Sequence, residues 1–441
     1  MKTYRIPAPF LLALAFSCFA QNGPGHIGAP VDTSSSASVP ITVEDAVAEA
    51  MNSNAQIRAA VRRLTLAESR IGTSRSLDDP MLMVRDWSTP LTRPWDLNQA
   101  QWMVSIQQTL VSRQIRDLRA KIAGDDTEMS ESELEALRQE IAVQVRKVCT
   151  DLERNTEEMK LHDRQSSLLK EALAASLAQY SAGRVPQLDV LRAQMSVTRL
   201  DEHLIELQRD REAAQAELDS LMGRPADEPV EISGEYAAVV DLPPLEEMER
   251  LATDHRPELA GLRKTIGKSQ DQAEATRLAK KPQFTVALGY MLMPTGSASR
   301  NAYMAELTMD MPGLNRARHE GEEKQADHAT AVARADLEAR TAAVFLEVRQ
   351  AQIAIATAEK RSKVYRDTLL PQADAAFKAA TAAYQNNRAE FSSLIESQNL
   401  LLDIQTALYR AAADRDTGLA ELERAIGTSL PGSTNPERGY K

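Results

Sequence analysis

Two stretches of the sequence, 204 positions apart, decide the fold: YSAGRVPQLDVLRAQ at residues 180–194 and YQNNRAEFSSLIESQ at residues 384–398. Each has a Tyr, an Arg four residues later and a Gln ten residues after that Arg. At the same offset, residues 180–223 and 384–427 share ten identities, and both segments end on Gly. A period of this length is far too long for a solenoid, so the sequence indicates a duplicated architecture.

The repeat continues towards the N-terminus at an offset of 202 positions. There Glu44 matches Glu246, Ala50 matches Ala252 and Pro80 matches Pro282. The sequence therefore predicts two tandem copies, residues 41–223 and 245–427. A linker at 224–244 joins them, and a C-terminal tail follows at 428–441.

Composition favours long helices and excludes some partners. Aromatic residues make up only 4% of the chain, 18 of its 441 residues are Gly, and Ala, Leu, Glu, Arg and Gln are abundant. The 52 basic and 63 acidic residues give a net charge of −11, which argues against nucleic acid as a partner. Beyond the N-terminus no run of about 18 uninterrupted apolar residues occurs, so no membrane-spanning helix is expected.

The N-terminus has the layout of a secretory signal peptide, residues 1–20. Two basic residues precede the apolar run IPAPFLLALAF, and small residues follow it. Cleavage after Ala20 is favoured, but lipidation of Cys18 stays open as the alternative. If Cys18 is removed, Cys149 is the only Cys left, so no disulfide framework is expected. Residues 21–40 are expected to be a flexible exported segment.

Each copy is predicted to contain two strands that form a hairpin, at about 80–110 and about 282–312. In the second copy apolar residues alternate with small or polar ones, which is the period of a strand. The alternating apolar residues are Phe284, Val286, Leu288, Tyr290 and Leu292, then Tyr303, Ala305, Leu307, Met309 and Met311.

Very long helices follow the hairpins. From Asn315 to Tyr384 the sequence has one Gly and one Pro, which predicts a rod of roughly 100 Å at about 1.5 Å per residue. The first copy has a similar stretch from Ser112 to Tyr180, with an expected soft spot at AGDDTEMSES, residues 123–132. The chain then breaks at helical tips and returns as another long helix with an amphipathic face. The tips are expected at about 181–187 and 385–391. The predicted fold class is mainly α with a small β part.

Strands with one apolar and one polar face suit a transmembrane barrel, with lipid outside and water inside. Four strands are too few to close a barrel, and lipid-exposed sheet edges are not tolerated. Two copies of the chain would supply eight strands and three copies would supply twelve. A soluble hairpin that covers a core is the alternative interpretation.

The order of landmarks resembles the TolC-like outer-membrane efflux proteins over about residues 41–427. The resemblance is carried by Y-x-x-G-x-x-x-x-x-D-V-L-x-A from Tyr180 to Ala193, by L-x-x-L-M-G from Leu218 to Gly223, and by MPGLNRAR after the last strand. It implies a homotrimer in the cell outer membrane, in which each chain supplies one third of a twelve-stranded barrel. Helices would continue the barrel as a tunnel through the periplasm.

The resemblance also implies a function and partners. Such ducts export substrates for tripartite efflux pumps or type I secretion, together with a periplasmic adaptor protein and an inner-membrane transporter. The runner-up interpretation is a soluble periplasmic coiled-coil scaffold or adaptor without a pore. An enzyme is not expected: the six His residues form no metal-binding pair, and no phosphate loop or framed nucleophile occurs. No cofactor and no resident metal are predicted.

The resemblance carries a pore aperture to the second tip. In the family an acidic residue twelve positions after the second-copy Tyr rings the aperture, and that position is Glu396. The family acid nine positions after the Tyr is replaced by Ser393, which could either weaken cation binding at the mouth or shift it to Glu390. A threefold ring of carboxylates would hold cations and repel anions. Alternatively, Glu396 is only a solvated surface residue.

Two further roles at the tips come from the resemblance. A latch between neighbouring coils matches Asp189 and Tyr384, whereas Arg388 lies one position earlier than the family Arg. The alternative is an incidental salt bridge. The tips are also where the adaptor would dock, at Gly183, Arg184 and Asn387.

The exported cargo is the least determined property. Thioethers are soft metal ligands, and six Met residues fall on the predicted lumen face: Met81, Met83, Met103, Met291, Met293 and Met304. Metal cations are therefore one candidate cargo, and drugs, other small molecules and proteins stay open. A register slip of one residue would move all six to the lipid side.

Overall fold

The structure, a computed structural model, describes most of the chain after residue 40. The described residues are 41–87, 101–225, 230, 232, 242–294, 296–297, 299–386 and 388–430. They belong to one compact unit, residues 39–441. The expected signal peptide, the segment 21–40, Cys18 and Asn387 lie outside the described residues.

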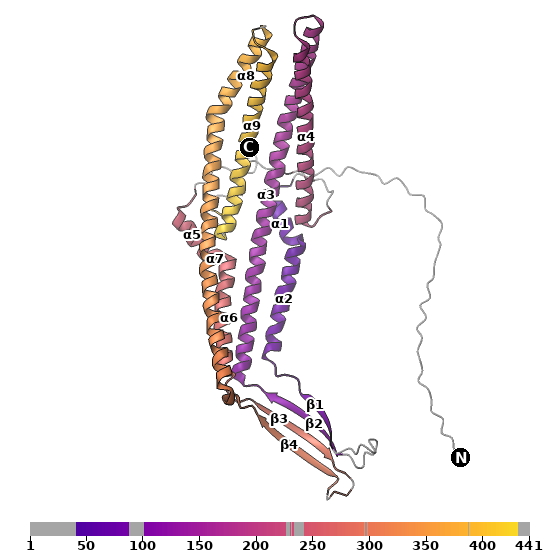
Figure 1. The fold of residues 1–441 in the computed structure, drawn as a ribbon, viewed down its shortest axis with the longest axis vertical. Coiled ribbons are helices and arrows are strands. Elements are labelled where there is room, and N and C mark those ends of the chain that lie inside the picture. Colours follow the sequence, from indigo (N-terminus) through magenta and orange to yellow (C-terminus); the bar gives the residue numbers. More distant parts are fainter. Residues whose placement is uncertain are drawn as a thin grey trace, which may run out of the picture. The chain divides into compact units, whose positions relative to one another are not determined.

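Within this unit, long antiparallel helices form a bundle, and a four-stranded sheet continues from one end of it (Figure 1). The predicted mainly α fold with a small β part is therefore confirmed. In the part of the chain that the structure describes, no helix has the length and apolarity needed to cross a bilayer. The first half contains the helices α1 (Val43–Ser53), α2 (Ala55–Arg75), α3 (Arg113–Ser181) and α4 (Gln187–Met222). The second half contains α5 (Leu245–His255), α6 (Pro257–Leu278), α7 (Arg316–Val364), α8 (Leu370–Gln385) and α9 (Phe391–Ile426).

The sheet joins the two halves. Its strands are β1 (Met81–Trp87), β2 (Gln101–Leu110), β3 (Phe284–Leu292) and β4 (Asn301–Met309), antiparallel in the order β1-β2-β3-β4. The central pair β2–β3 comes from different halves and runs in register from Trp102 opposite Leu292 to Leu110 opposite Phe284. Because each half contributes one hairpin, neither half can complete the sheet alone.

Both tips reverse through the same backbone hydrogen bonds. The Arg184 N–H donates to the Gln179 carbonyl at 2.9 Å, and the Arg388 N–H donates to the Ala383 carbonyl at 2.8 Å. Both pairs obey the 204-position offset of the sequence repeat. At the first tip Gly183 has φ 70°, a left-handed conformation that favours Gly at a helix end.

The opposite ends of the returning helices also share one construction. The helix α4 ends at Gly223 (φ 73°) and α9 ends at Gly427 (φ 75°). Gly223 lies against the junction of α1 and α2, where an added Cβ would be 2.6 Å from the Ser53 carbonyl oxygen. Gly427 lies against the junction of α5 and α6, where an added Cβ would be 2.7 Å from the His255 carbonyl oxygen. Only a residue without a Cβ fits this approach.

The last step in the repeat offset, from 203 to 204 positions, has a structural explanation. The buried residues Ile141, Val145, Val148 and Leu152 of α3 correspond, 203 positions later, to the buried residues Val344, Val348, Ala351 and Ile355 of α7. Nearer the tips, the buried residues Leu169 and Ala373 correspond at 204 positions. Between these two levels, the π-helix η2 (Tyr365–Leu369) lies at the junction of α7 and α8. A π-turn takes up one extra residue, so η2 restores the packing register between the halves.

The expected soft spot at 123–132 is wrong, since α3 continues through it without a break. Two acidic residues of this segment are paired with lysines of α6. Asp126 bonds Lys268 at 2.5 Å, and Glu128 is paired with Lys264. An acidic run that looks solvated in the sequence is therefore held in the helix by lysines more than 100 positions away.

We predict that Gly427→Ala destabilises the protein more than Gly183→Ala. Both positions have positive φ, so each variant carries backbone strain of about 1–3 kcal/mol. Only at Gly427 does the new Cβ also collide with backbone atoms of His255, whereas nothing lies within 4 Å of a Cβ at Gly183. The apparent melting temperature of the purified protein in detergent measures the difference.

The variant Gly223→Ala serves as the second collision case, because its Cβ would meet the Ser53 backbone. It should behave like Gly427→Ala. Equal shifts for all three variants would show that the close approach contributes nothing beyond the backbone strain.

Candidate functional site

The strand register divides the sheet into two chemically different faces. Residues opposite one another on antiparallel strands share a face. The apolar face carries Leu82, Val84, Val104, Ile106, Phe284, Val286, Leu288, Tyr290, Ala305 and Leu307. The polar face carries Arg85, Gln101, Ser105, Gln107, Thr109, Thr285, Glu306 and Thr308, together with methionines.

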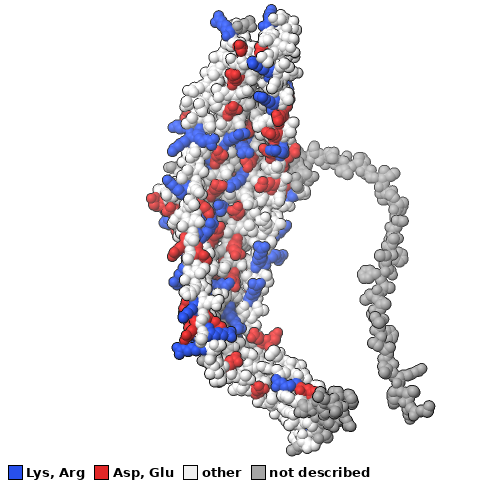
Figure 2. Space-filling model, in the orientation of Figure 1, with Lys and Arg blue, Asp and Glu red and all other residues white. Residues whose placement is uncertain are grey.

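The apolar face is uncovered in the single chain. Leu82 is 68% exposed, Leu288 63% and Leu307 68%. In the view of Figure 2 charged side chains cover the helical bundle, while the sheet end is mostly free of them. A contiguous exposed apolar surface of this kind marks contact with protein or membrane.

The two edges of the sheet are also open. Within the described residues, β1 and β4 each pair with one strand only, on their inner sides. Their outer edges present backbone N–H and C=O groups without strand partners, which is a template for further strand pairing. The sheet therefore lacks a covering partner on its apolar face and strand partners at both edges; we call it the unfinished sheet.

The methionines singled out in the sequence lie together on the polar face. Met81, Met83, Met103, Met291 and Met304 share that face by register. Met293 follows β3, and its N–H donates to the Arg300 carbonyl at 2.9 Å. Whether this face lines a lumen stays a prediction.

The three candidate aperture residues lie on one side of the start of α9. Glu390, Ser393 and Glu396 are exposed, whereas Phe391 and Leu394, between them in sequence, are buried in the bundle. Glu390 is the N-cap residue of α9, and its carboxylate accepts a hydrogen bond from Ser392 at 3.3 Å. The side chains of Ser393 and Glu396 are free to face another molecule.

The three latch residues do not meet within one chain. Asp189 is half-buried in the first turn of α4, and Arg388 is exposed after α8. The Tyr384 ring packs edge-to-face on Phe391, with 5.6 Å between ring centroids. Among the described residues, the buried Tyr384 hydroxyl has no hydrogen-bond partner. Gly183 and Arg184, two of the proposed docking residues, are exposed at the first tip.

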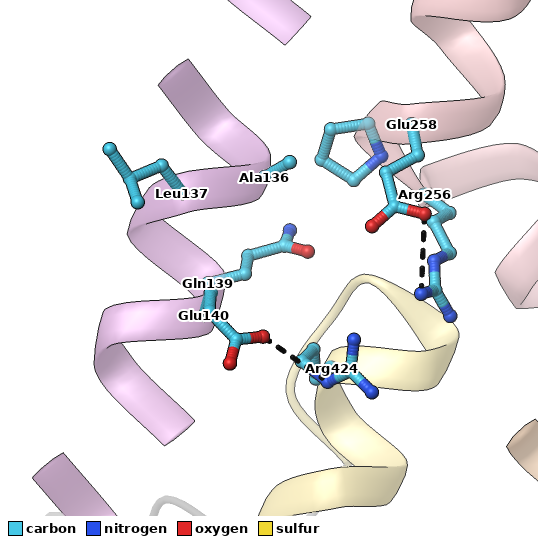
Figure 3. A pocket seen from close by; sticks show the side chains of 8 residues that line it. Ala136, Leu137, Gln139, Glu140, Arg256, Glu258 and Arg424 are labelled. Atoms are coloured by element: carbon cyan, nitrogen blue, oxygen red, sulfur yellow. Dashed lines mark hydrogen bonds and ion pairs between the residues drawn. The ribbon is translucent and has the colours of Figure 1, made fainter. Parts of the chain in front are cut away.

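An ion-pair network at the middle of the bundle was missed by the sequence analysis. Arg256, only 2% exposed, bonds the Glu347 carboxylate at 2.7 Å and Glu258 at 3.4 Å. Arg340 is paired with Glu258 and bonds Glu347 at 2.9 Å. Arg424 of α9 extends this network to the first half of the chain (Figure 3), where its Nε lies 3.7 Å from a Glu140 oxygen.

The position of Arg256 explains why a charged residue is buried there. Its guanidinium donates to the Ala425 carbonyl at 3.3 Å, near the end of α9. The equivalent tie in the first half is made by Asn54, which donates to the Leu221 carbonyl at 2.9 Å. The acceptor residues Leu221 and Ala425 are 204 positions apart, and the donor residues Asn54 and Arg256 are 202 positions apart. Both pairs therefore follow the repeat offsets. The sequence signal was therefore present in the alignment of Asn54 with Arg256.

The network changes the acidity of Glu258. Burial by itself would raise the pKa of this carboxyl. The hydrogen bond from Arg340 and the positive charges of Arg256 and Arg340 outweigh that effect and hold the pKa below its usual value. Ionised Glu258 therefore stabilises the folded chain.

Comparisons with known proteins bear on both halves. The model of the outer membrane efflux protein family matches residues 46–224 and 250–428. The cobalt-zinc-cadmium resistance protein CzcC of Cupriavidus metallidurans is 23% identical over 433 residues, which cover 96% of this chain and 99% of that protein.

Solved structures share the fold at low identity. A CusC structure has a TM-score of 0.75 at 14% identity and covers 89% of this chain and 93% of that chain. The Campylobacter jejuni CmeC outer membrane channel has a TM-score of 0.74 at 12% identity, covering 94% of this chain and 95% of that chain.

We predict that Glu258→Gln lowers the melting temperature at pH 7 and flattens its dependence on acid. The stabilisation by ionised Glu258 is complete above the usual carboxyl pKa of about 4.3. It is lost as the pH falls through the lower pKa of the folded state. The wild type should therefore lose more stability between pH 7 and about pH 3 than the variant.

The matched control is Glu338→Gln, which removes an exposed carboxylate from α7. Its melting curve should follow the wild type at each pH. Parallel curves for wild type and Glu258→Gln would contradict a folded-state pKa below the usual value.

Proposed function

Because this chain belongs to the outer membrane efflux protein family, we propose that it is the homotrimeric outer-membrane channel of a tripartite efflux system that exports metal cations. Its place in the outer membrane follows from the family. The number of copies, the partners and the cargo are the proposal.

The observation that carries the proposal is the unfinished sheet. In lipid every backbone polar group must be paired, so an open edge on β1 or β4 cannot face the bilayer. Pairing the β1 edge of one copy with the β4 edge of the next removes both edges by symmetry. Lipid then covers the apolar face, and the polar face encloses water.

Three copies suit this closure better than two. An eight-stranded barrel has an interior that side chains nearly fill, whereas a wider barrel leaves a channel. Three copies of four strands give twelve. A soluble scaffold, the competing interpretation, would need a cover for the apolar face, and the described residues supply none.

The helices would continue the barrel as a tunnel that narrows at the tips. The exposed Glu396 of each copy would form a ring of three carboxylates, flanked by Ser393 and Glu390. At separations of several Å and an effective dielectric near 20, each charge offers a cation on the order of 2–4 kcal/mol before screening. Salt reduces this attraction.

The proposed assembly also includes a latch between neighbouring coils and tips at which the adaptor docks. Asp189 of one coil would pair with Tyr384 and Arg388 of a neighbouring coil, and the unpartnered Tyr384 hydroxyl is consistent with a partner outside the chain. Each exposed ion pair contributes only about 0–1 kcal/mol, but symmetry would multiply it by three. Gly183, Arg184 and Asn387 would meet the adaptor, which connects to the inner-membrane transporter.

The cargo proposal rests on one relative. CzcC, by its name, is a cobalt-zinc-cadmium resistance protein, and it matches this chain over nearly its whole length. Drugs and other small molecules are the second candidate class.

We predict that Leu307→Arg reduces the amount of trimer in the outer membrane, while Glu306→Arg leaves it unchanged. The two positions are adjacent on β4 but lie on opposite faces. An Arg on the lipid face costs up to about 2–4 kcal/mol per chain, less towards the membrane interfaces, whereas the polar face tolerates charge. Heat-modifiability gels of outer-membrane fractions measure the assembled trimer.

Equal assembly of both variants would mean that the apolar face does not contact lipid. A wild-type protein that is monomeric and extractable with salt would overturn the channel itself and favour the scaffold.

We predict that single-channel recordings separate the aperture from the latch. Glu396→Gln should reduce cation selectivity and block by trivalent cations, because it removes charge and keeps the shape.

Asp189→Ala should raise conductance, because a missing latch lets the tips separate. Reversal potential, block and conductance are measured on purified trimer in planar bilayers.

The control Glu338→Gln removes a carboxylate on α7, far from the tips, and should match the wild type. If Glu396→Gln keeps full selectivity, the ring is not at the aperture and Glu390 becomes the candidate. Unchanged conductance of Asp189→Ala would show that other contacts hold the tips.

A further inference from the structure

Four methionines, one on each strand, lie in two adjacent cross-strand rows of the polar face: Met83 and Met304 in one row, Met103 and Met291 in the next. Met103 of β2 lies directly opposite Met291 of β3. Met83 lies opposite Ser105, which makes it the diagonal neighbour of Met103. Met304 lies opposite Gly289, which makes it the diagonal neighbour of Met291. We call Met83, Met103, Met291 and Met304 the methionine band.

The spacing lets the thioethers meet. Directly opposite Cβ atoms are about 4.5–5.5 Å apart, and diagonal neighbours are about 7–8 Å apart, within reach of long flexible side chains. Met103 is only 1% exposed, so its side chain is covered by neighbouring groups. The band therefore brings soft sulfur atoms from four strands into two adjacent rows of the sheet.

Small residues around the band leave room for these side chains. Ser105, Ala287, Gly289 and Ala302 occupy the same face. At Gly289 an added Cβ would lie 2.9 Å from the Ser105 Cβ, so a larger residue would not fit. The partner position of Met304 thus carries no side chain, and Met304 can lie across it towards Met291.

Two of the sulfur atoms already act as acceptors. The Gln101 amide donates to the Met291 Sδ at 2.9 Å, and the Arg85 guanidinium lies 3.1 Å from the Met83 Sδ. A thioether sulfur has two lone pairs, so one remains available on each. The charge of Arg85 disfavours a cation at Met83, whereas Glu306 lies on the same face of β4, two residues from Met304. A cation is therefore best placed between Met103, Met291 and Met304.

We propose that the methionine band is a binding site for a soft monovalent cation, Cu(I) or its analogue Ag(I). Thioethers select soft cations, while Zn(II), Co(II) and other harder cations prefer imidazole, thiolate or carboxylate. Among the residues that the structure describes, no group of three or more His, Cys, Asp or Glu could hold a metal ion. The chain therefore offers harder cations no comparable site there.

The site deepens the proposed function but does not depend on it for its ligands, since a single chain supplies all the thioethers. The proposed trimer would repeat the band around the barrel as twelve thioethers in two adjacent rows. A conducting pathway needs sites that bind well enough to admit an ion and weakly enough to release it. Neutral ligands without a carboxylate cage meet that requirement.

The test uses full-length purified protein in detergent, with silver nitrate in chloride-free buffer as the probe. The variant Met103→Leu/Met291→Leu/Met304→Leu should bind Ag(I) about tenfold more weakly or worse, since every 1.4 kcal/mol of lost binding is tenfold in Kd. Leu conserves volume, so folding should be retained. Met309→Leu, on the opposite face of β4, is the matched control and should bind like the wild type.

A second measurement needs no mutation. Coordination protects a thioether sulfur from oxidation, so Ag(I) should slow peroxide oxidation of the half-buried Met291 and Met304 in the wild type. Met309 should oxidise at the same rate with and without Ag(I), and Zn(II) should protect none of them. Mass spectrometry of peptides reads each site separately.

The outcomes separate this inference from the proposed channel. Wild-type affinity in the triple variant, or equal protection of Met309, overturns the methionine site. Planar-bilayer conductance of the same preparations reports on the channel independently. Normal conductance without selective Ag(I) binding would leave the channel standing and remove the site, and binding without conductance would do the reverse.

Discussion

A sheet with one exposed apolar face and two open edges cannot stand alone, and the rest of this protein depends on that constraint. Leu288 and Leu307 expose most of their surface, and β1 and β4 offer unpaired backbone. In a bilayer, lipid covers the apolar face. The backbone N–H and C=O groups of the two edge strands, however, find hydrogen-bond partners only in further strands. The described part of the chain supplies no further strand, and in the proposed trimer other copies supply the missing strands. Closure of the sheet then sets where α3 and α7, which begin after β2 and β4, enter the helical bundle.

Local sequence signals predicted the parts of the fold that depend on local physics. The alternation from Phe284 to Leu292 gave the strand and its faces, because period two follows from backbone geometry. The Gly-poor and Pro-poor stretch after Asn315 gave the long helix. The π-helix before α8 had only an indirect signal, the change of repeat offset from 202 to 204, which did not show where the extra residues lie. The acidic soft spot was misread because its partners, Lys264 and Lys268, lie on another helix.

The sequence predicted which residues of the candidate site share a face of the sheet, but it did not predict which side chains contact one another. Placing the methionines on one face needed only the strand period. The network around Arg256 could not be derived from local pattern, because Glu258, Glu347 and Arg424 come from α6, α7 and α9. Comparing the halves shows why it exists. In the first half the neutral Asn54 side chain donates a hydrogen bond to a backbone carbonyl of α4, and in the second half Arg256 donates the equivalent bond to α9. Because Arg256 carries a buried charge, it needs carboxylates as partners.

The same divergence between the halves sets the charge of the proposed aperture. At the repeat offset of 204 positions, Arg192 of the first half corresponds to Glu396 of the second, and both are exposed. Asp189 corresponds in the same way to Ser393. Had both halves kept Glu at this level, a threefold assembly would place six like charges around one narrow opening. With Arg192 in the first half, the proposed trimer has three carboxylates alternating with three guanidinium groups. The guanidinium groups would reduce both the mutual repulsion among the carboxylates and the attraction of the ring for a cation. In the proposed trimer the duplication would give the tunnel nearly sixfold packing, and the side chains at the tips would reduce this to threefold symmetry.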